Sequence, residues 1–135
     1  VQIDNSDFRV ENTKWSIKDL GTLESDSSEA VWINDQCEVL GRYQLKGKHS
    51  VFLWSKEKGV RTVELPQNAN LKKLNNLGQI LFDIPVERYE NSQKLCSSRS
   101  CIWDPAKGII EISNDKLGEF QANDINDNGI LIGRF

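Results

Sequence analysis

The sequence contains few of the residues that usually bind metal ions, and it has no long apolar run. It has one histidine, three cysteines and no methionine in 135 residues. A structural zinc site usually takes four well-spaced Cys or His ligands, so this composition excludes a conventional one. No apolar run approaches the roughly 20 residues that a membrane-spanning helix needs. We therefore expect no metal site and no membrane span.

Clustered positive charge is also missing. The 17 Lys and Arg residues are scattered among 20 Asp and Glu residues, and the formal net charge is −3. Nucleic-acid binding usually depends on a basic face, so we expect no nucleic-acid partner. The sequence begins without methionine. This fits a chain whose signal peptide has been removed, or one that starts at a chosen boundary.

Recognisable catalytic motifs are absent too, including the G-x-S-x-G elbow and glycine-rich phosphate loops. Two carboxylates can suffice for glycoside hydrolysis, and Asp35 and Asp127 occupy equivalent positions, but turn chemistry explains both. The stretch 124–129 is similar to the start of a calcium loop, yet Phe135 stands where the loop needs glutamate. We predict no catalytic residue and no cofactor, and the sequence favours a protein that is not an enzyme.

The chain does contain a repeated phrase. It reads "INDQCEVLGRY" at Ile33–Tyr43, "LNNLGQILFD" at Leu74–Asp83 and "INDNGILIGRF" at Ile125–Phe135. Asn, Asp and Gly tolerate the positive φ that tight turns require, so each phrase predicts a β-hairpin, here called IND-type. Continuous apolar residues after each turn predict exit strands that are buried on both faces.

A second phrase alternates with the first. It reads "VFLWSKEKGV" at Val51–Val60 and "SCIWDPAKGI" at Ser100–Ile109, with a faded copy, "FRVENTKWSIKDL", at Phe8–Leu20. Trp54 and Trp103 each end an apolar segment before a turn that closes on glycine, which predicts a second kind of hairpin, here called W-type. We expect the two tryptophans to be structurally equivalent and mostly buried.

The two phrases together predict an all-β protein of three repeats, each with a W-type hairpin followed by an IND-type hairpin, and about twelve short strands. The single repeat domain covers residues 1–135. Repeats of 41 to 51 residues with four strands have the size of a propeller blade, whereas a β-trefoil is the alternative that also uses three such units. The expected hairpins lie near 8–20, 48–65 and 99–113 (W-type) and near 29–43, 70–84 and 121–135 (IND-type).

The stretch "DLGTLESDSSEAVWINDQCEVLG" at Asp19–Gly41, followed by "SVFLWSKEKGV", resembles the HAF-repeat family of bacterial extracellular proteins. The resemblance covers nearly the whole chain and implies propeller-like repeats in a secreted or cell-envelope protein. It implies no enzyme activity. The family's His-Ala-Phe is Ser50-Val51-Phe52 here, and Phe82 replaces a closing glycine, so no role of the literal triplet is transferred.

Four residues are candidates for binding. Trp32 is equivalent to the polar Lys73 and Asp124, which predicts that it is exposed. Arg42 and Arg134 recur after closing glycines, where an edge charge that prevents sheet-to-sheet pairing is the alternative explanation. His49 is the only imidazole, and its hydrophilic surroundings predict an exposed loop.

Two of the three cysteines are close in sequence. Cys96 and Cys101 would be near enough to form a disulfide if the protein is exported.

The repeats also suggest a function. We expect a non-catalytic binding or assembly module with a glycan or protein ligand, and a carbohydrate-active enzyme or lectin-like domain is the alternative. Three blades leave two apolar end faces, which predicts a homo-oligomer, most simply a two-fold dimer, or a longer repeat chain.

Overall fold

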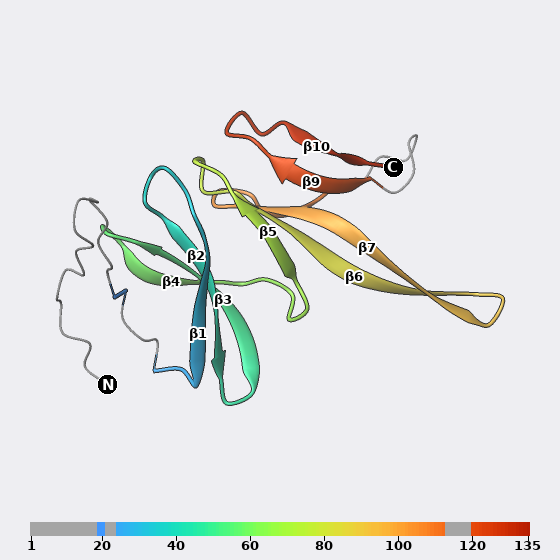
Figure 1. Cartoon of the computed structure of the whole chain (residues 1–135), viewed down its shortest axis with the longest axis horizontal. Helices are drawn as coiled ribbons and strands as arrows, with labels where there is room; N and C mark the ends of the chain where they lie inside the picture. The colour runs from blue at the N-terminus through green and yellow to red at the C-terminus, as the bar shows by residue number, and fades with distance from the viewer. Residues whose placement is uncertain (1–18, 21–23, 113–119) are drawn as a thin grey trace, which may run out of the picture.

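A computed structural model describes residues 19–20, 24–112 and 120–135. These residues form ten β-strands and no helix, arranged in three separate antiparallel sheets, none of which closes into a barrel (Figure 1). The expectation of an all-β fold is therefore confirmed, whereas ten strands stand where about twelve were expected. Within the described part of the chain, no helix could cross a membrane.

The first two sheets are four-stranded meanders, and the third has two strands. The first sheet contains β1 (Ser27–Ile33), β2 (Val39–Leu45), β3 (Lys48–Ser55) and β4 (Gly59–Val63). The second contains β5 (Asn70–Leu74), β6 (Ile80–Glu90), β7 (Gln93–Asp104) and β8 (Gly108–Glu111). The third pairs β9 (Gln121–Ile125) with β10 (Leu131–Arg134).

The five predicted hairpins that fall within the described residues are present, but the sheets group them differently from the expected order, in which each W-type hairpin comes before an IND-type hairpin of the same repeat. Each four-stranded sheet joins an IND-type hairpin to the W-type hairpin that follows it, through a third hairpin between them. The third sheet is an IND-type hairpin alone. The faded W-type hairpin near 8–20 lies outside the described residues, apart from residues 19 and 20. The first strands of the three units, β1, β5 and β9, lie side by side.

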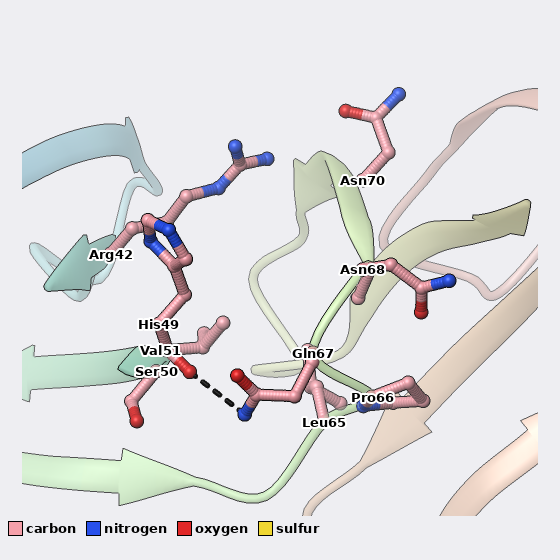
Figure 2. Close-up of a pocket in the computed structure, with 10 residues that line it drawn as sticks. Arg42, His49, Ser50, Val51, Leu65, Pro66, Gln67, Asn68 and Asn70 are labelled. Atoms are coloured by element: carbon pink, nitrogen blue, oxygen red, sulfur yellow. Dashed lines mark hydrogen bonds between the residues drawn. The ribbon is translucent and has the colours of Figure 1, made fainter. Parts of the chain in front are cut away.

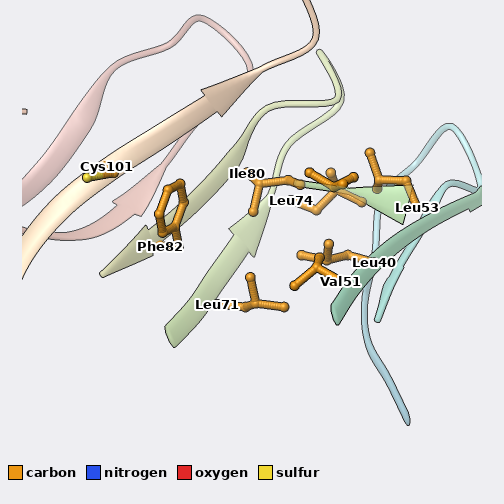
Figure 3. Close-up of a cluster of buried hydrophobic side chains, with 9 residues drawn as sticks. Leu40, Val51, Leu53, Leu71, Leu74, Ile80, Phe82 and Cys101 are labelled. Atoms are coloured by element: carbon orange, nitrogen blue, oxygen red, sulfur yellow. The ribbon is translucent and has the colours of Figure 1, made fainter. Parts of the chain in front are cut away.

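The sheets pack face to face through two apolar clusters. In the first cluster, Leu40, Leu53 and neighbouring residues of the first sheet contact Leu74, Ile80 and Phe82 of the second (Figure 3). In the second cluster, the opposite face of the second sheet contacts the third. That cluster contains Leu81, Ala122 and Ile125 as its buried members.

The exit strand of the middle repeat is buried on both faces, as its continuous apolar sequence predicted. Ile80 and Phe82 point toward the first sheet, and Leu81 points toward the third. All three are fully buried. The period-two alternation of a strand thus supplies an apolar residue to each neighbouring sheet.

The size of one cross-strand pair explains why Phe82 replaces a closing glycine. Gly41 lies opposite Phe52, and a Cβ on Gly41 would come within 2.2 Å of the Phe52 ring. At the equivalent position of the second sheet, Phe82 lies opposite Cys101. The large and small residues have therefore changed strands while the combined volume is kept, which is the kind of exchange that a packed core tolerates.

Trp54 and Trp103 are equivalent in register. Trp54 pairs with Val39 and Val60, and Trp103 pairs with Ile80 and Ile109. Both are mostly buried, although neither is fully so, and Trp103 lies at the edge of the first apolar cluster. The predicted equivalence and the predicted burial are both confirmed. The closed barrel that a β-trefoil requires is not formed by the described strands.

Variants that exchange the large and the small residue of the Phe82–Cys101 pair test this compensation. Phe82→Gly should lower the free energy of unfolding by at least about 3 kcal/mol, because a buried ring is lost. Cys101→Phe alone should cost about 1–3 kcal/mol through overpacking. The double variant recreates the pairing of Gly41 with Phe52, so its loss should fall short of the sum by about 0.5–3 kcal/mol. Chemical denaturation of all four proteins measures this coupling, and strictly additive losses would contradict it.

Candidate functional site

The three IND-type turns are built in the same way around one asparagine. The side-chain oxygen of Asn34 accepts hydrogen bonds from the backbone N–H groups of Gln36 and Glu38 at 3.1 and 2.9 Å. Asn75 and Asn126 make the equivalent pairs of bonds in their own turns. Such side-chain caps satisfy backbone groups that a tight turn leaves unpaired.

The asparagines do not have the positive φ angles that the sequence suggested for these turns. Positive φ falls three residues later, at Cys37 (φ 57°), Gly78 (φ 73°) and Gly129 (φ 75°). The asparagine is therefore selected for its amide, and the glycine position for its backbone freedom. Cys37 adopts a conformation that is unfavourable for a residue with a Cβ.

The same asparagines link one repeat to the next. The Nδ2 atom of Asn34 donates to the carbonyl oxygen of Asn75 at 3.0 Å, and Nδ2 of Asn75 donates to that of Asn126 at 3.1 Å. Next to them, the N–H of Asp35 donates to Oδ1 of Asn76, and the N–H of Asn76 donates to Oδ1 of Asp127, each at 2.8 Å. We call this series of bonds the turn ladder.

The middle turn is also tied to a W-type turn of its own sheet. Nδ2 of Asn75 donates to Oε1 of Gln79, and Nε2 of Gln79 donates to the Asp104 carboxylate, both at 2.8 Å. The bond from Gln79, followed by the backbone N–H of Ala106, lowers the pKa of Asp104 below its usual value. Asp104 therefore stays an acceptor at the start of its turn even in mildly acidic solution.

A depression of about 290 Å³ lies where the three turns meet. Three equivalent residues of the first strands are in contact there. Nζ of Lys73 lies 5.3 Å from the centre of the Trp32 ring and 3.3 Å from Oδ1 of Asp124. Trp32 is 37% exposed, as predicted from its polar equivalents. An indole, an ammonium group and a carboxylate thus share one rim, each contributed by a different repeat.

Two carboxylates also meet at this depression. Nδ2 of Asn76 donates to Oδ2 of Asp35 at 2.9 Å and to Oδ2 of Asp127 at 2.7 Å. Because both oxygens bind the same nitrogen, they lie within about 6 Å of each other. The sequence showed only that Asp35 and Asp127 occupy equivalent positions, and the structure shows that Asn76 brings them together.

A second pocket, of about 320 Å³, contains two other predicted binding residues. Figure 2 shows the Arg42 side chain beside the imidazole of His49, with the loop from Leu65 to Asn70 opposite. Gln67 is fixed in this loop by donating from Nε2 to the backbone carbonyl of His49 at 2.9 Å. His49 is exposed, as expected, but it lies in β3 rather than in a loop. Nε of Arg42 is buried and has no hydrogen-bond partner among the described residues.

Arg134 lies outside both depressions. Its Nε and Nη2 atoms donate to Oε1 of Gln121 at 3.1 and 3.0 Å, and it is exposed on β10. The bidentate contact holds the side chain along the last hairpin. This placement agrees better with an edge charge than with a binding residue.

Sequence analysis missed a buried polar network at the position equivalent to Arg42 and Arg134. Asp83 is buried, forms an ion pair with Lys72 at 2.5 Å and accepts a hydrogen bond from Ser100 at 2.8 Å. Lys72 and Ser100 in turn bind the carbonyl and the N–H of Ala122. The network joins the second and third sheets. The change of charge sign at this position was its only signal in the sequence.

The three thiols are free, and the possible bridge between Cys96 and Cys101 is not formed. Both residues lie in the extended strand β7, five residues apart. Successive residues of a strand rise about 3.3 Å and alternate faces, so the two side chains point to opposite faces roughly 16 Å apart. Their sequence spacing suits a loop, but this segment is a long strand.

Known proteins provide no assignment. No protein-family model matches the chain, and no curated protein or solved structure shows significant similarity to it. In the described part of the chain, no group of three or more His, Cys, Asp or Glu side chains is placed to hold a metal ion.

The turn ladder leads to a stability prediction. Asn75 is buried and both caps its turn and donates to the third repeat. Asn75→Ala should lower the free energy of unfolding by about 3 kcal/mol, because buried backbone groups lose their partners. Asn126→Ala is the matched control. It removes the same local cap from an exposed turn, so we expect a loss of about 1 kcal/mol. Equal losses in thermal or chemical unfolding would contradict a role for Asn75 between repeats.

The thiols lead to a chemical prediction. Burial, together with the nearby negative charges of Glu111 and Asp83, raises the pKa of Cys101. The reactive thiolate is therefore depleted there. At pH 8, iodoacetamide should modify the exposed Cys37 and Cys96 and spare Cys101 until denaturant is added, as read by peptide mass spectrometry. The pKa of Cys101 is higher in the folded protein than in the unfolded one. This thiol should therefore lower the free energy of unfolding only as the pH rises above its pKa in the unfolded protein. Modification of Cys101 as fast as Cys96 would disprove its protection.

Proposed function

We propose that this chain is a non-catalytic binding or assembly module whose ligand-binding surface is the depression at the three IND-type turns. One observation carries this proposal. The capping asparagine is the same in all three repeats, while the residue two positions before it and the residue directly after it vary. Trp32, Lys73 and Asp124 occupy one such position, and Asp35, Asn76 and Asp127 the other. Repeat proteins often form binding surfaces in this way, with varied side chains on a constant frame.

The paired carboxylates do not favour an enzyme. A retaining glycosidase holds its two carboxyl groups about 5–5.5 Å apart on either side of the scissile bond. The gap between Asp35 and Asp127 is instead occupied by the Asn76 amide, which donates to both. No substrate atom can lie between these oxygens while the amide is there. Holding the turns together therefore explains this pair better than acid–base catalysis.

A glycan is the ligand class that the depression favours, as in a lectin-like domain. Nζ of Lys73 lies over the Trp32 ring, 5.3 Å from its centre, and the side chain remains partly exposed to solvent. Aromatic faces bind the apolar face of a sugar ring, and carboxylates and amides accept or donate hydrogen bonds to its hydroxyl groups. The neighbouring Asp35, Asn76 and Asp127 supply such groups.

We also propose that the chain is a relative of the HAF-repeat proteins and acts outside the cell or in the cell envelope. The support is the sequence resemblance, together with repeated four-stranded meanders whose first strands lie side by side. A propeller-like arrangement would follow from the same two features. Arg42 and His49 form a second candidate surface, suited by charge to an anionic group on a ligand.

Calorimetric titration with neutral and acidic oligosaccharides tests the binding proposal. A sugar that binds should lose about tenfold or more in affinity with Trp32→Ala, because an aromatic anchor is removed. Tyr89→Ala is the control, since Tyr89 is an exposed aromatic in the outer part of β6. It should leave the affinity unchanged. Unchanged binding by Trp32→Ala would show that the sugar binds at another site. Release of reducing sugar would favour the alternative of a carbohydrate-active enzyme.

A further inference from the structure

The two contacts between neighbouring repeats follow one rule. Leu40 of the first exit strand packs in the same cluster as Leu74, the apolar lead residue of the second repeat. Leu81 of the second exit strand packs with Ile125, the lead residue of the third. All four side chains are buried. The exit-strand residue of each repeat therefore covers the lead residue of the next.

The residues that would continue this rule are exposed at the two ends. Ile132 is equivalent to Leu40 and Leu81, and it is 63% exposed. Ile33 is equivalent to Leu74 and Ile125, and it is 66% exposed. Figure 1 shows the first sheet and the β9–β10 hairpin on different sides of the second sheet. Among the described residues, no further repeat covers Ile132 or Ile33.

The turn ladder is open at the same two ends. Within the described residues, Asn126 caps its own turn and has no hydrogen bond from Nδ2 comparable to those of Asn34 and Asn75. At the other end, the Asn34 carbonyl accepts, from the described part of the chain, only the N–H of Cys37, whereas the equivalent carbonyls of Asn75 and Asn126 also accept a side-chain amide. One end thus offers a donor and the other an acceptor.

We propose that these ends join between two copies of the chain. Ile132 of one copy covers Ile33 of the other, and Nδ2 of Asn126 donates to the Asn34 carbonyl of the other copy. The contact continues, between chains, the interface already formed twice within the chain. Each copy carries both complementary ends, so two copies joined at both ends close into a two-fold ring of six repeats. This inference rests on the assembly part of the proposed function and names its partner.

At the position of Asp35, Asn76 and Asp127, the junction between copies would carry one more negative charge than the internal ones. Within the chain, Asp35 and Asp127 each contact Asn76. Between copies, Asp127 would meet Asp35 of the second copy, with no amide between the two carboxylates. Two like charges in contact weaken association. Replacing one of them by asparagine recreates the internal pairing and should strengthen the junction.

Sedimentation velocity and light scattering of the full chain over a concentration series test the proposal. We expect a monomer–dimer equilibrium that Ile132→Glu and Ile33→Glu each abolish without changing the unfolding midpoint, because both side chains are exposed. Ile109→Glu on β8 is the matched control, since Ile109 is a similarly exposed isoleucine away from both ends. It should leave the equilibrium unchanged. Asp127→Asn should tighten the dimer by up to about fivefold.

Mixing the two disruptive variants distinguishes unlike ends from a face that pairs with itself. The Ile33→Glu chain keeps Ile132, and the Ile132→Glu chain keeps Ile33, so the mixture can form one intact junction. We expect a heterodimer at concentrations where neither variant associates alone. A monomeric wild-type chain at every concentration, species larger than dimers, or a mixture that stays monomeric would overturn the proposal. Dimerisation without glycan binding would refute the sugar site alone, and sugar binding by a strict monomer would refute only the ring.

Discussion

The side-chain amide of one asparagine in each IND-type turn is the interaction on which the arrangement of the sheets depends. Its oxygen closes the turn, and its nitrogen binds the next repeat. The spacing between these asparagines is 41 residues in one case and 51 in the other. The longer unit carries most of its extra residues in the β6–β7 hairpin, which extends away from the turns (Figure 1). The contacts between turns therefore tolerate insertions at the other end of a sheet.

Local features of the fold could be read from the sequence, and the grouping of hairpins could not. Turn residues and continuous apolar runs predicted the IND-type hairpins and the two-sided burial of Ile80–Phe82, because both depend on residues close in sequence. The alternation of W-type and IND-type phrases reads the same whichever comes first, so it cannot show where a sheet begins. The long pairing of β6 with β7 extends through polar residues that do not alternate strictly with apolar ones, so the sequence did not predict it. This pairing places Cys96 in a strand, whereas the spacing of the cysteines suited a loop.

The candidate site was predictable residue by residue but not as a constellation. Comparing equivalent positions showed that Trp32 would be exposed. That Lys73 would lie between Trp32 and Asp124 depends on how the repeats stack, which spacing along the chain does not specify. The same limit applies to Asp83. As a single residue it looks like another edge charge, and only the packing of the second sheet on the third makes it a buried partner of Lys72 and Ser100.

The turn ladder has a direction, and this constrains how the repeats can be completed. Every inter-repeat bond of the capping asparagines has its donor in the earlier repeat and its acceptor in the later one. A series of such bonds has two unlike ends, so no contact of one end with its own copy can extend it. Only a further repeat, a cap of different sequence or closure on itself can pair both ends. Because the positions next to the asparagines vary while the direction is kept, the proposed binding surface can change its chemistry without disturbing the stacking of the turns.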